Sequence, residues 1–293
     1  MKAHYPRIRL HAEHGALWVR ESLHVCFYMH LPHEEVAPCI LDALECYCRE
    51  VGPQSLGFYV DYEGNWQQLD GFRQRELRRE MLEGQWTLLE MRDTPQEVGA
   101  YGFSYYGKSR ATLDAASASD AVSAVSFWLP TEYLEASGPE HVRAFALHLA
   151  ATLPWSSGHA GLAFKSLTGL LETEESRQLC LRYPGIDVAD VSTISWHLGQ
   201  RVRVPSWMNF MRPPVQALPH LIQTGFDFQS LEEGRAVITL GLWPEAGDLT
   251  EGRNLPLYRE LVRTLEPWRY HEHVPRRSLM GEHVRRWDRR FLE

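Results

Sequence analysis

The segment that decides the fold is RAVITLGLWPEAGDLTEGRNLPLYRELVRTLEPW, which runs from Arg235 to Trp268. Its apolar, β-branched beginning predicts a strand over residues 236–242. Pro244 and Gly247 then end the strand, because proline lacks the amide donor and glycine frees the backbone. From residue 256 to 265, leucine, tyrosine and valine side chains recur at helical spacing. The segment therefore predicts a strand, an acidic loop and a helix that packs back onto the sheet.

The predicted helix carries its own boundary signals. Asn254 is placed to cap it, and Pro256 suits a first helical turn, where the missing N–H costs little. Glu266 precedes Pro267, and the residue before a proline disfavours helical geometry. We therefore expect the helix to end at this pair.

The same order of strand, proline, helix and proline occurs three times. The instances are Val25–Pro53, Val125–Pro154 and Val237–Pro267. They predict two further helices, over residues 33–51 and 139–153, and one interpretation is a duplicated α+β unit. We therefore divide the chain into an N-terminal lobe, 1–168, and a C-terminal lobe, 169–293, that meet at a seam near Leu167–Gly169.

Other strands and helices fill the intervals between these units. The further predicted strands are Ala16–Arg20, His24–Leu31, Leu56–Tyr62, Trp86–Met91, Tyr101–Tyr106, Gly158–Phe164, Val202–Met211 and Phe226–Leu231. Two more helices are expected over 72–83 and 170–183, and a hairpin turn at Glu21-Ser22. The predicted fold class is α+β, with mixed or antiparallel sheets flanked by helices; two related strand–helix lobes are one arrangement that fits.

Composition is that of a globular protein with an acidic body. The 293 residues are 44% hydrophobic and 23% charged, with a formal net charge of −8. The segment 275–293 holds six arginines against three acidic residues, a net charge of +3, so the remainder carries −11. This balance argues against general affinity for nucleic acid and favours a basic partner.

Cysteine usage and the beginning of the chain predict a reduced, cytoplasmic protein. There are five cysteines, an odd number, and four of them lie in the first sixth of the chain. That pattern does not resemble a secreted disulfide framework. The first residues, MKAHYPRIRLHAEHG, lack an apolar core of signal-peptide length, and no apolar run approaches membrane-spanning length.

No motif predicts catalysis, a metal site or a cofactor. Cys46 and Cys48 have one residue between them, unlike the two to four of zinc loops, so they are interpreted as structural. His271-Glu272-His273 could hold a metal weakly, but solvated histidines are the preferred interpretation. Ser156 to His159 lacks the frame of a nucleophile elbow, and phosphate-binding loop motifs are absent from the sequence. We therefore predict a protein that is not an enzyme.

Two charged regions could bind partners. The arginine pairs after residue 275 alternate with apolar residues at helical spacing, which predicts a C-terminal helix docked on the body rather than a nucleic-acid site. The acidic loop leaves a rigid strand and is expected to stay exposed. The predicted partner-binding residues are Trp243, Glu245, Asp248, Glu251, Glu232 and Glu233. Trp243 is either an aromatic anchor for the partner or a core residue.

Several segments in order resemble a known family. They are SGHAGL at 157–162, YPGID at 183–187, VPSWMNFM at 204–211, GLWPEAGD at 241–248 and LPLY at 255–258. On these segments the chain resembles the bacterial type VI secretion immunity proteins, over residues 20–270, as one family domain. The resemblance implies an antitoxin that binds a cognate toxin effector, a DNase similar to restriction endonucleases, and blocks its active or DNA-binding site. It implies no catalytic residues.

Two alternatives remain open at this point. One is a metal-assisted hydrolase that uses an acidic cluster, and the other is a nucleic-acid-binding module that uses the arginine-rich tail. The immunity interpretation expects a basic nuclease as partner, no direct contact with nucleic acid or membrane, and no cofactor. Steric occlusion of the nuclease is the mechanism we prefer over allosteric distortion.

Overall fold

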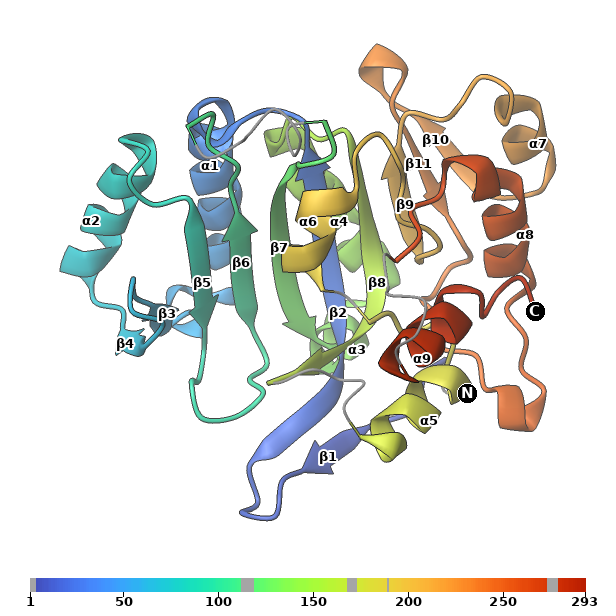
Figure 1. The fold of residues 1–293 in the computed structure, drawn as a ribbon, viewed down its shortest axis with the longest axis horizontal. Coiled ribbons are helices and arrows are strands. Elements are labelled where there is room, and N and C mark those ends of the chain that lie inside the picture. Colours follow the sequence, from blue (N-terminus) through green and yellow to red (C-terminus); the bar gives the residue numbers. More distant parts are fainter. Residues whose placement is uncertain (1–3, 112–118, 168–172, 189, 273–278) are drawn as a thin grey trace.

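The computed structural model describes residues 4–111, 119–167, 173–188, 190–272 and 279–293 (Figure 1). Its centre is an eleven-stranded antiparallel sheet in the order β10-β11-β9-β8-β2-β7-β6-β5-β3-β4, with β1 paired to β2. The strands are β1 Arg9–His11, β2 Leu17–Met29, β3 Phe58–Val60, β4 Trp66–Gln68, β5 Leu88–Arg92, β6 Gly102–Tyr106, β7 Ser123–Pro130, β8 Ser157–Ser166, β9 Met208–Met211, β10 Asp227–Ser230 and β11 Ala236–Thr239. Together with the helices this confirms the predicted α+β class.

The middle strand, β2, corrects one prediction. Instead of two short strands with a turn at Glu21-Ser22, a single strand of 13 residues pairs with β7 on one side and β8 on the other. Glu21 lies within this strand, and its side chain is fully buried. A charge in the middle of an apolar run suggested a turn, whereas in the structure distant residues satisfy the carboxylate.

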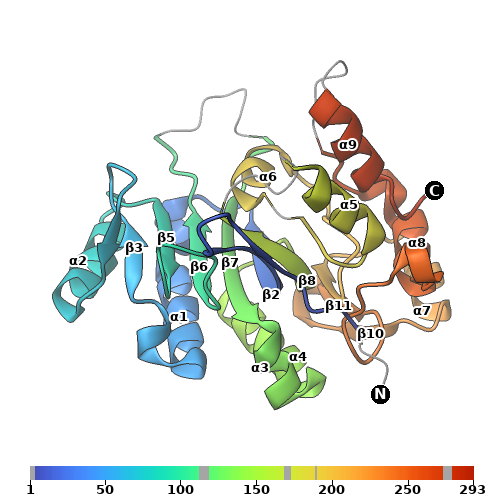
Figure 2. The same ribbon diagram turned by 90° about the horizontal axis from the view of Figure 1, so that it is seen from below.

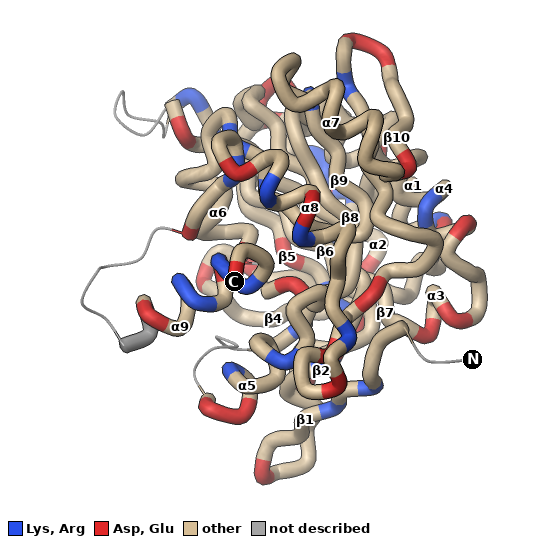
Figure 3. The backbone as a smooth tube through the Cα atoms, turned by 90° about the vertical axis from the view of Figure 1, so that its right-hand side faces the viewer, with Lys and Arg blue, Asp and Glu red and all other residues tan. Residues whose placement is uncertain are grey.

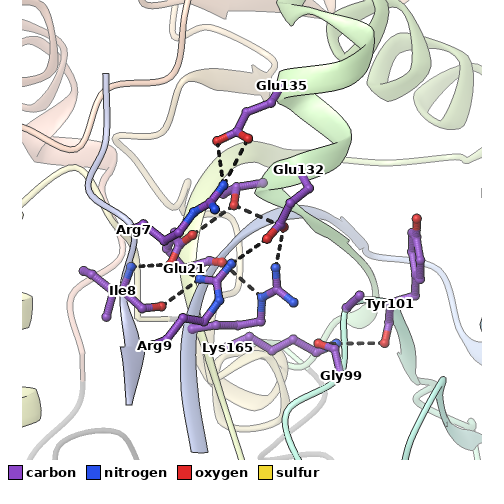
Figure 4. A network of polar contacts seen from close by, with 12 residues as sticks. Arg7, Ile8, Arg9, Glu21, Gly99, Tyr101, Glu132, Glu135 and Lys165 are labelled. Atoms are coloured by element: carbon purple, nitrogen blue, oxygen red, sulfur yellow. Dashed lines mark hydrogen bonds and ion pairs between the residues drawn. The ribbon is translucent and has the colours of Figure 1, made fainter. Parts of the chain in front are cut away.

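The partners of Glu21 come from the chain's beginning and from α3 (Thr131–Ser137). The Ile8 amide donates to the carboxylate at 2.7 Å and the Thr131 hydroxyl at 2.9 Å, and the Arg9 guanidinium completes the set. Arg9 also reaches Glu132, at 2.8 Å (Figure 4). The network ties β1 to the middle of the sheet and to α3.

Helices cover one face of the sheet over its middle strands. They are α1 His33–Val51, α3 and α4 Pro139–Thr152, while α2 Gly71–Leu82 lies at the β3–β5 end (Figures 1 and 2). Alternate residues of β2 and β7, such as Phe27 and Phe127, point into this layer and join α1 and α4 in the main hydrophobic core. The predicted helices over 33–51 and 139–153 are thus confirmed.

A second layer lies on the opposite face. It consists of α5 Glu174–Arg182, α6 Val191–His197 and α9 Leu279–Asp288 (Figure 2). The short α7, Leu218–Gln223, packs with α8, Pro256–Leu265, beside β9 and β11. The predicted helix over 256–265 is confirmed, but Asn254 is not its cap: Leu255 occupies that position without a side-chain bond.

One sheet spans both predicted lobes. Strand β8, from residues before 168, pairs with β9, from residues after 169, in antiparallel register from Gly158↔Phe210 to Ala160↔Met208. The division into 1–168 and 169–293 stays a prediction, and its seam lies mostly at 168–172, outside the described residues. Strand β9 begins only at Met208; before it, Val202 forms an isolated bridge with Arg269. Among the described helices, none is long and apolar enough to cross a bilayer.

Candidate functional site

The acidic loop after β11 is held in shape by a buried carboxylate. Asp248 is 1% exposed and accepts from Nε and Nη2 of Arg182 in α5 at 3.1 and 2.8 Å. It also accepts from the amides of Thr250 and Glu251, at the start of the short 3₁₀ helix Leu249–Glu251. The Arg182 guanidinium holds the pKa of Asp248 well below its usual range. Our expectation that this residue is exposed was therefore wrong.

Other side chains of the loop do face the solvent. Leu242 and Leu249 are 65% and 42% exposed, and the carboxylates of Glu245 and Glu251 are about half exposed or more. The loop thus presents two leucines with acidic groups beside them, on a backbone that Asp248 holds in place. Preorganised, partly apolar surfaces of this kind suit tight protein recognition, because little conformational entropy is lost on binding.

Trp243 has features of both of its predicted roles, core residue and surface anchor. It is half-buried and packs on the main core, and its outer side stacks on His4 with ring centroids 5.2 Å apart and planes 4° apart. The amide of Ala246 donates to the His4 carbonyl at 3.0 Å, so the chain's beginning lines this side of the loop. His4 is therefore a residue of the candidate surface that sequence reasoning missed.

The structure does not bring Glu232 and Glu233 to this loop. They lie in the turn between β10 and β11, at the opposite end of β11. Glu233 has a positive φ of 57° and lies 3.5 Å from Arg212 and 3.7 Å from Arg235. Acidic and basic positions are interspersed along this side of the molecule (Figure 3). The predicted acidic residues therefore form two separate clusters rather than one continuous acidic surface.

We expect Asp248→Asn to lower the free energy of unfolding by about 2 kcal/mol, because two charge-assisted bonds to Arg182 weaken and the cap of the 3₁₀ turn is lost in part. Urea unfolding followed by tryptophan fluorescence measures the change. Glu251→Gln, at an exposed carboxylate of the same loop, is the control and should change stability by less than about 0.5 kcal/mol. Equal effects of the two substitutions would contradict the anchoring role.

A polar concavity lies on the sheet face over β5 to β8, beside the second layer. Its volume is about 430 Å³, and Ser104, Ser126 and Trp128 line it. Lys165, also in its lining, donates to the carbonyls of Gly99 at 2.9 Å and Tyr101 at 2.7 Å. Burial lowers the pKa of this lysine to about 7. Sequence reasoning missed this site, because few polar residues mark this face of β6 and β7 in the sequence.

The residues considered for chemistry do not form a reactive centre. His159 is buried with both ring nitrogens unbonded, and burial lowers its pKa to about 4. His271 lies 2.9 Å from Asp288, and His273 falls outside the described residues. Within the described ranges there is no group of three or more His, Cys, Asp or Glu residues that could hold a metal ion.

The C-terminal helix docks on the body as its apolar spacing predicts. Trp287 and Phe291 are buried, and Arg290 donates from Nε to the Pro184 carbonyl at 2.8 Å. Arg269 pairs with Asp288 of the same helix at 2.8 Å. The arginine pair at 276–277 lies outside the described residues. Packing on the body thus accounts for Trp287, Arg290 and Phe291 of this segment.

Comparison with known proteins identifies a family and a similar fold. Residues 39–291 match a family model described as type VI immunity for VRR-NUC. The fold is similar to that of the Pseudomonas aeruginosa T6SS protein PA0821, with a TM-score of 0.75 and 19% sequence identity over 99% of this chain and 88% of that one. No curated protein matches the chain significantly in sequence.

Proposed function

Because the chain belongs to the family of type VI immunity proteins for VRR-NUC nucleases, we propose that it neutralises its cognate effector by docking the acidic loop over the nuclease's substrate groove. Family membership implies a role as an inhibitor rather than an enzyme. The observation that supports the docking surface is the combination in one anchored loop of exposed leucines, exposed carboxylates and a half-buried tryptophan.

Charge complementarity supports this choice of surface. A DNA-cleaving effector needs a positive groove to hold the phosphate backbone. Glu245 and Glu251 would meet such a groove and speed association, while Leu242 and Leu249 would be buried on contact. Occlusion of the groove by the loop would exclude DNA without any change in the effector's fold. Cytoplasmic action follows from this proposal, because the DNA to be protected lies there.

We expect Glu245→Lys combined with Glu251→Lys to slow association with the effector by about tenfold at low ionic strength, because exposed charges steer the encounter. The rates of wild type and variant should converge as salt is added. Stopped-flow fluorescence with the purified effector measures both. Asp248 is left unchanged, since it holds the loop.

Two further variants locate the contact. Glu232→Lys with Glu233→Lys reverses the acidic pair at the other end of β11, which stays a predicted contact. Glu13→Lys with Glu140→Lys reverses two exposed acids elsewhere and serves as the charge-matched control. If the control pair slows association as much as the loop pair, only net charge matters and the proposed surface is wrong. Magnesium-dependent DNA hydrolysis by the purified protein would instead favour the hydrolase alternative.

A further inference from the structure

A second surface of different character lies at the far end of the sheet. Strand order places α2, which follows β4, at the opposite end from β10 and β11 (Figures 1 and 2). Between α1 and α2 there is a groove of about 320 Å³ whose floor includes Leu89 of β5. Its lining is mostly apolar, with Leu44 from α1 and Leu77 and Met81 from α2, each less than 9% exposed.

The rim of this groove carries two arginines that have no carboxylate partner in the part of the chain that the structure describes. Four arginines lie on α2, and two of them are paired: Arg73 with Glu80 at 3.0 Å and Arg79 with Glu76 at 2.7 Å. Arg75 and Arg78 are exposed at the groove, and among the described residues neither has an ion pair. On a protein of net charge −8, this is a local basic rim beside an apolar floor.

The opposite rim adds little negative charge. Glu45 of α1 lines the groove, but its carboxylate lies 3.2 Å from Arg49 one turn further along the helix. Cys48, also in the lining, is half-buried and uncharged, because burial raises the pKa of its thiol to about 11. Among the residues described, the charged groups at the groove that lack an ion-pair partner are therefore the guanidinium groups of Arg75 and Arg78.

We propose that the α1–α2 groove binds an acidic amphipathic helix of a partner protein. An apolar groove between two helices accepts the apolar face of a third, with side chains spaced one turn apart. Arg75 and Arg78 lie three residues apart on one helix, so they can meet carboxylates that flank the apolar stripe of the incoming helix. The acidic loop lies at the other end of the sheet, so the effector and this helical partner can be bound together.

The probe that tests this is a fluorescein-labelled amphipathic peptide of leucine and glutamate, compared with a matched peptide in which lysine replaces glutamate. Fluorescence anisotropy with the full-length protein should show the acidic peptide binding at least about tenfold more tightly. Arg75→Glu with Arg78→Glu should lower this affinity about tenfold or more. Cys48→Phe, which fills the groove without a change in charge, should also lower it.

The control is Arg212→Glu with Arg263→Glu, an equal charge reversal at exposed positions near the other end of the sheet. It should leave peptide affinity within about twofold of wild type. All groove variants should bind the effector as wild type does. A wrong proposal for the groove can therefore be distinguished from a wrong proposal for the acidic loop. Equal affinity for both peptides, or an equal loss of affinity in the control variant, would overturn the proposal. So would tighter binding of the protein to a DNA duplex or to anionic vesicles that depends on Arg75 and Arg78.

Discussion

Arg9→Ala is expected to lower the free energy of unfolding by about 3–5 kcal/mol, because it leaves the Glu21 carboxylate buried without its counter-ion. Glu21 is 1% exposed, whereas the guanidinium of Arg9 is 21% exposed and reaches it from β1. The amide of Ile8 and the hydroxyl of Thr131 would still donate, but neither carries a compensating charge. Urea denaturation with linear extrapolation measures the loss.

Arg7→Ala provides the control, since Arg7 belongs to the same network at the surface. Its guanidinium is 62% exposed and pairs with Glu135, itself 48% exposed, so its removal should change stability by less than about 0.5 kcal/mol. A double variant, Arg9→Met with Glu21→Leu, should recover part of the loss by replacing the buried pair with apolar contact. Equal losses from Arg7→Ala and Arg9→Ala would show that Glu21 does not depend on its partner.

Two buried histidines are together expected to lower stability by up to about 4 kcal/mol between pH 7.5 and pH 5. His24 and His159 are buried with unbonded ring nitrogens, and their rings lie 5.4 Å apart. Burial lowers the pKa of both, that of His159 to about 4. Because these pKa values are below the unfolded value of about 6.5, the unfolded state takes up protons first as the pH falls. The stability that the two neutral histidines contribute is therefore fully present above pH 6.5 and is lost as the pH falls toward 4.

Other shifted groups also contribute in or near this pH window, among them His30, whose pKa is lowered by burial. Lys165, with its pKa lowered to about 7, loses its contribution as the pH falls from about 10.5 and becomes flat only below about pH 6. Asp187, which lies 3.9 Å from His159, has a pKa lowered to about 2 and titrates at more acidic pH. Burial raises the pKa of Glu272, so its protonation adds stability as the pH falls and opposes the loss from the histidines.

Substitution assigns the acid sensitivity to these histidines. His159→Gln and, separately, His24→Phe should each lower the slope of unfolding free energy against pH between 5 and 6, by up to about half. His148→Gln, at an exposed histidine, should leave the slope unchanged. An unaltered slope in both buried variants would assign the acid sensitivity to other groups. Two variants at different strands are used because one of them alone could fail to fold.

Local sequence signals predicted the helices well because the causes of these helices are local. The predicted bounds of α1 and α8 are those of the structure, since the apolar periodicity lies within each helix and the prolines lie in it or within two residues of its ends. The strand β2 was divided wrongly because the residues that satisfy Glu21 come from positions 8, 9 and 131. A window around Glu21 contains none of them.

The candidate surface was predicted in part, because only its local features can be recognised in the sequence. Glu245 and Glu251 are exposed as expected, because a loop after a strand usually meets the solvent. Asp248 was placed with them, since its partner in the ion pair is distant in the sequence. Its partner, Arg182, lies 66 residues away in α5. Which of several acids in a loop is structural depends on tertiary contacts that one sequence does not display.

The anchoring of the acidic loop separates what must stay constant in evolution from what is free to change. Asp248 and Arg182 fix the backbone, so substitution of either disturbs the fold. Leu242, Glu245 and Glu251 face the solvent, where most substitutions change stability by less than about 0.5 kcal/mol. A lineage whose effector alters its surface can therefore follow by drift at the exposed positions alone. Rapid divergence of partner choice on an unchanged scaffold is the expected history of such a loop.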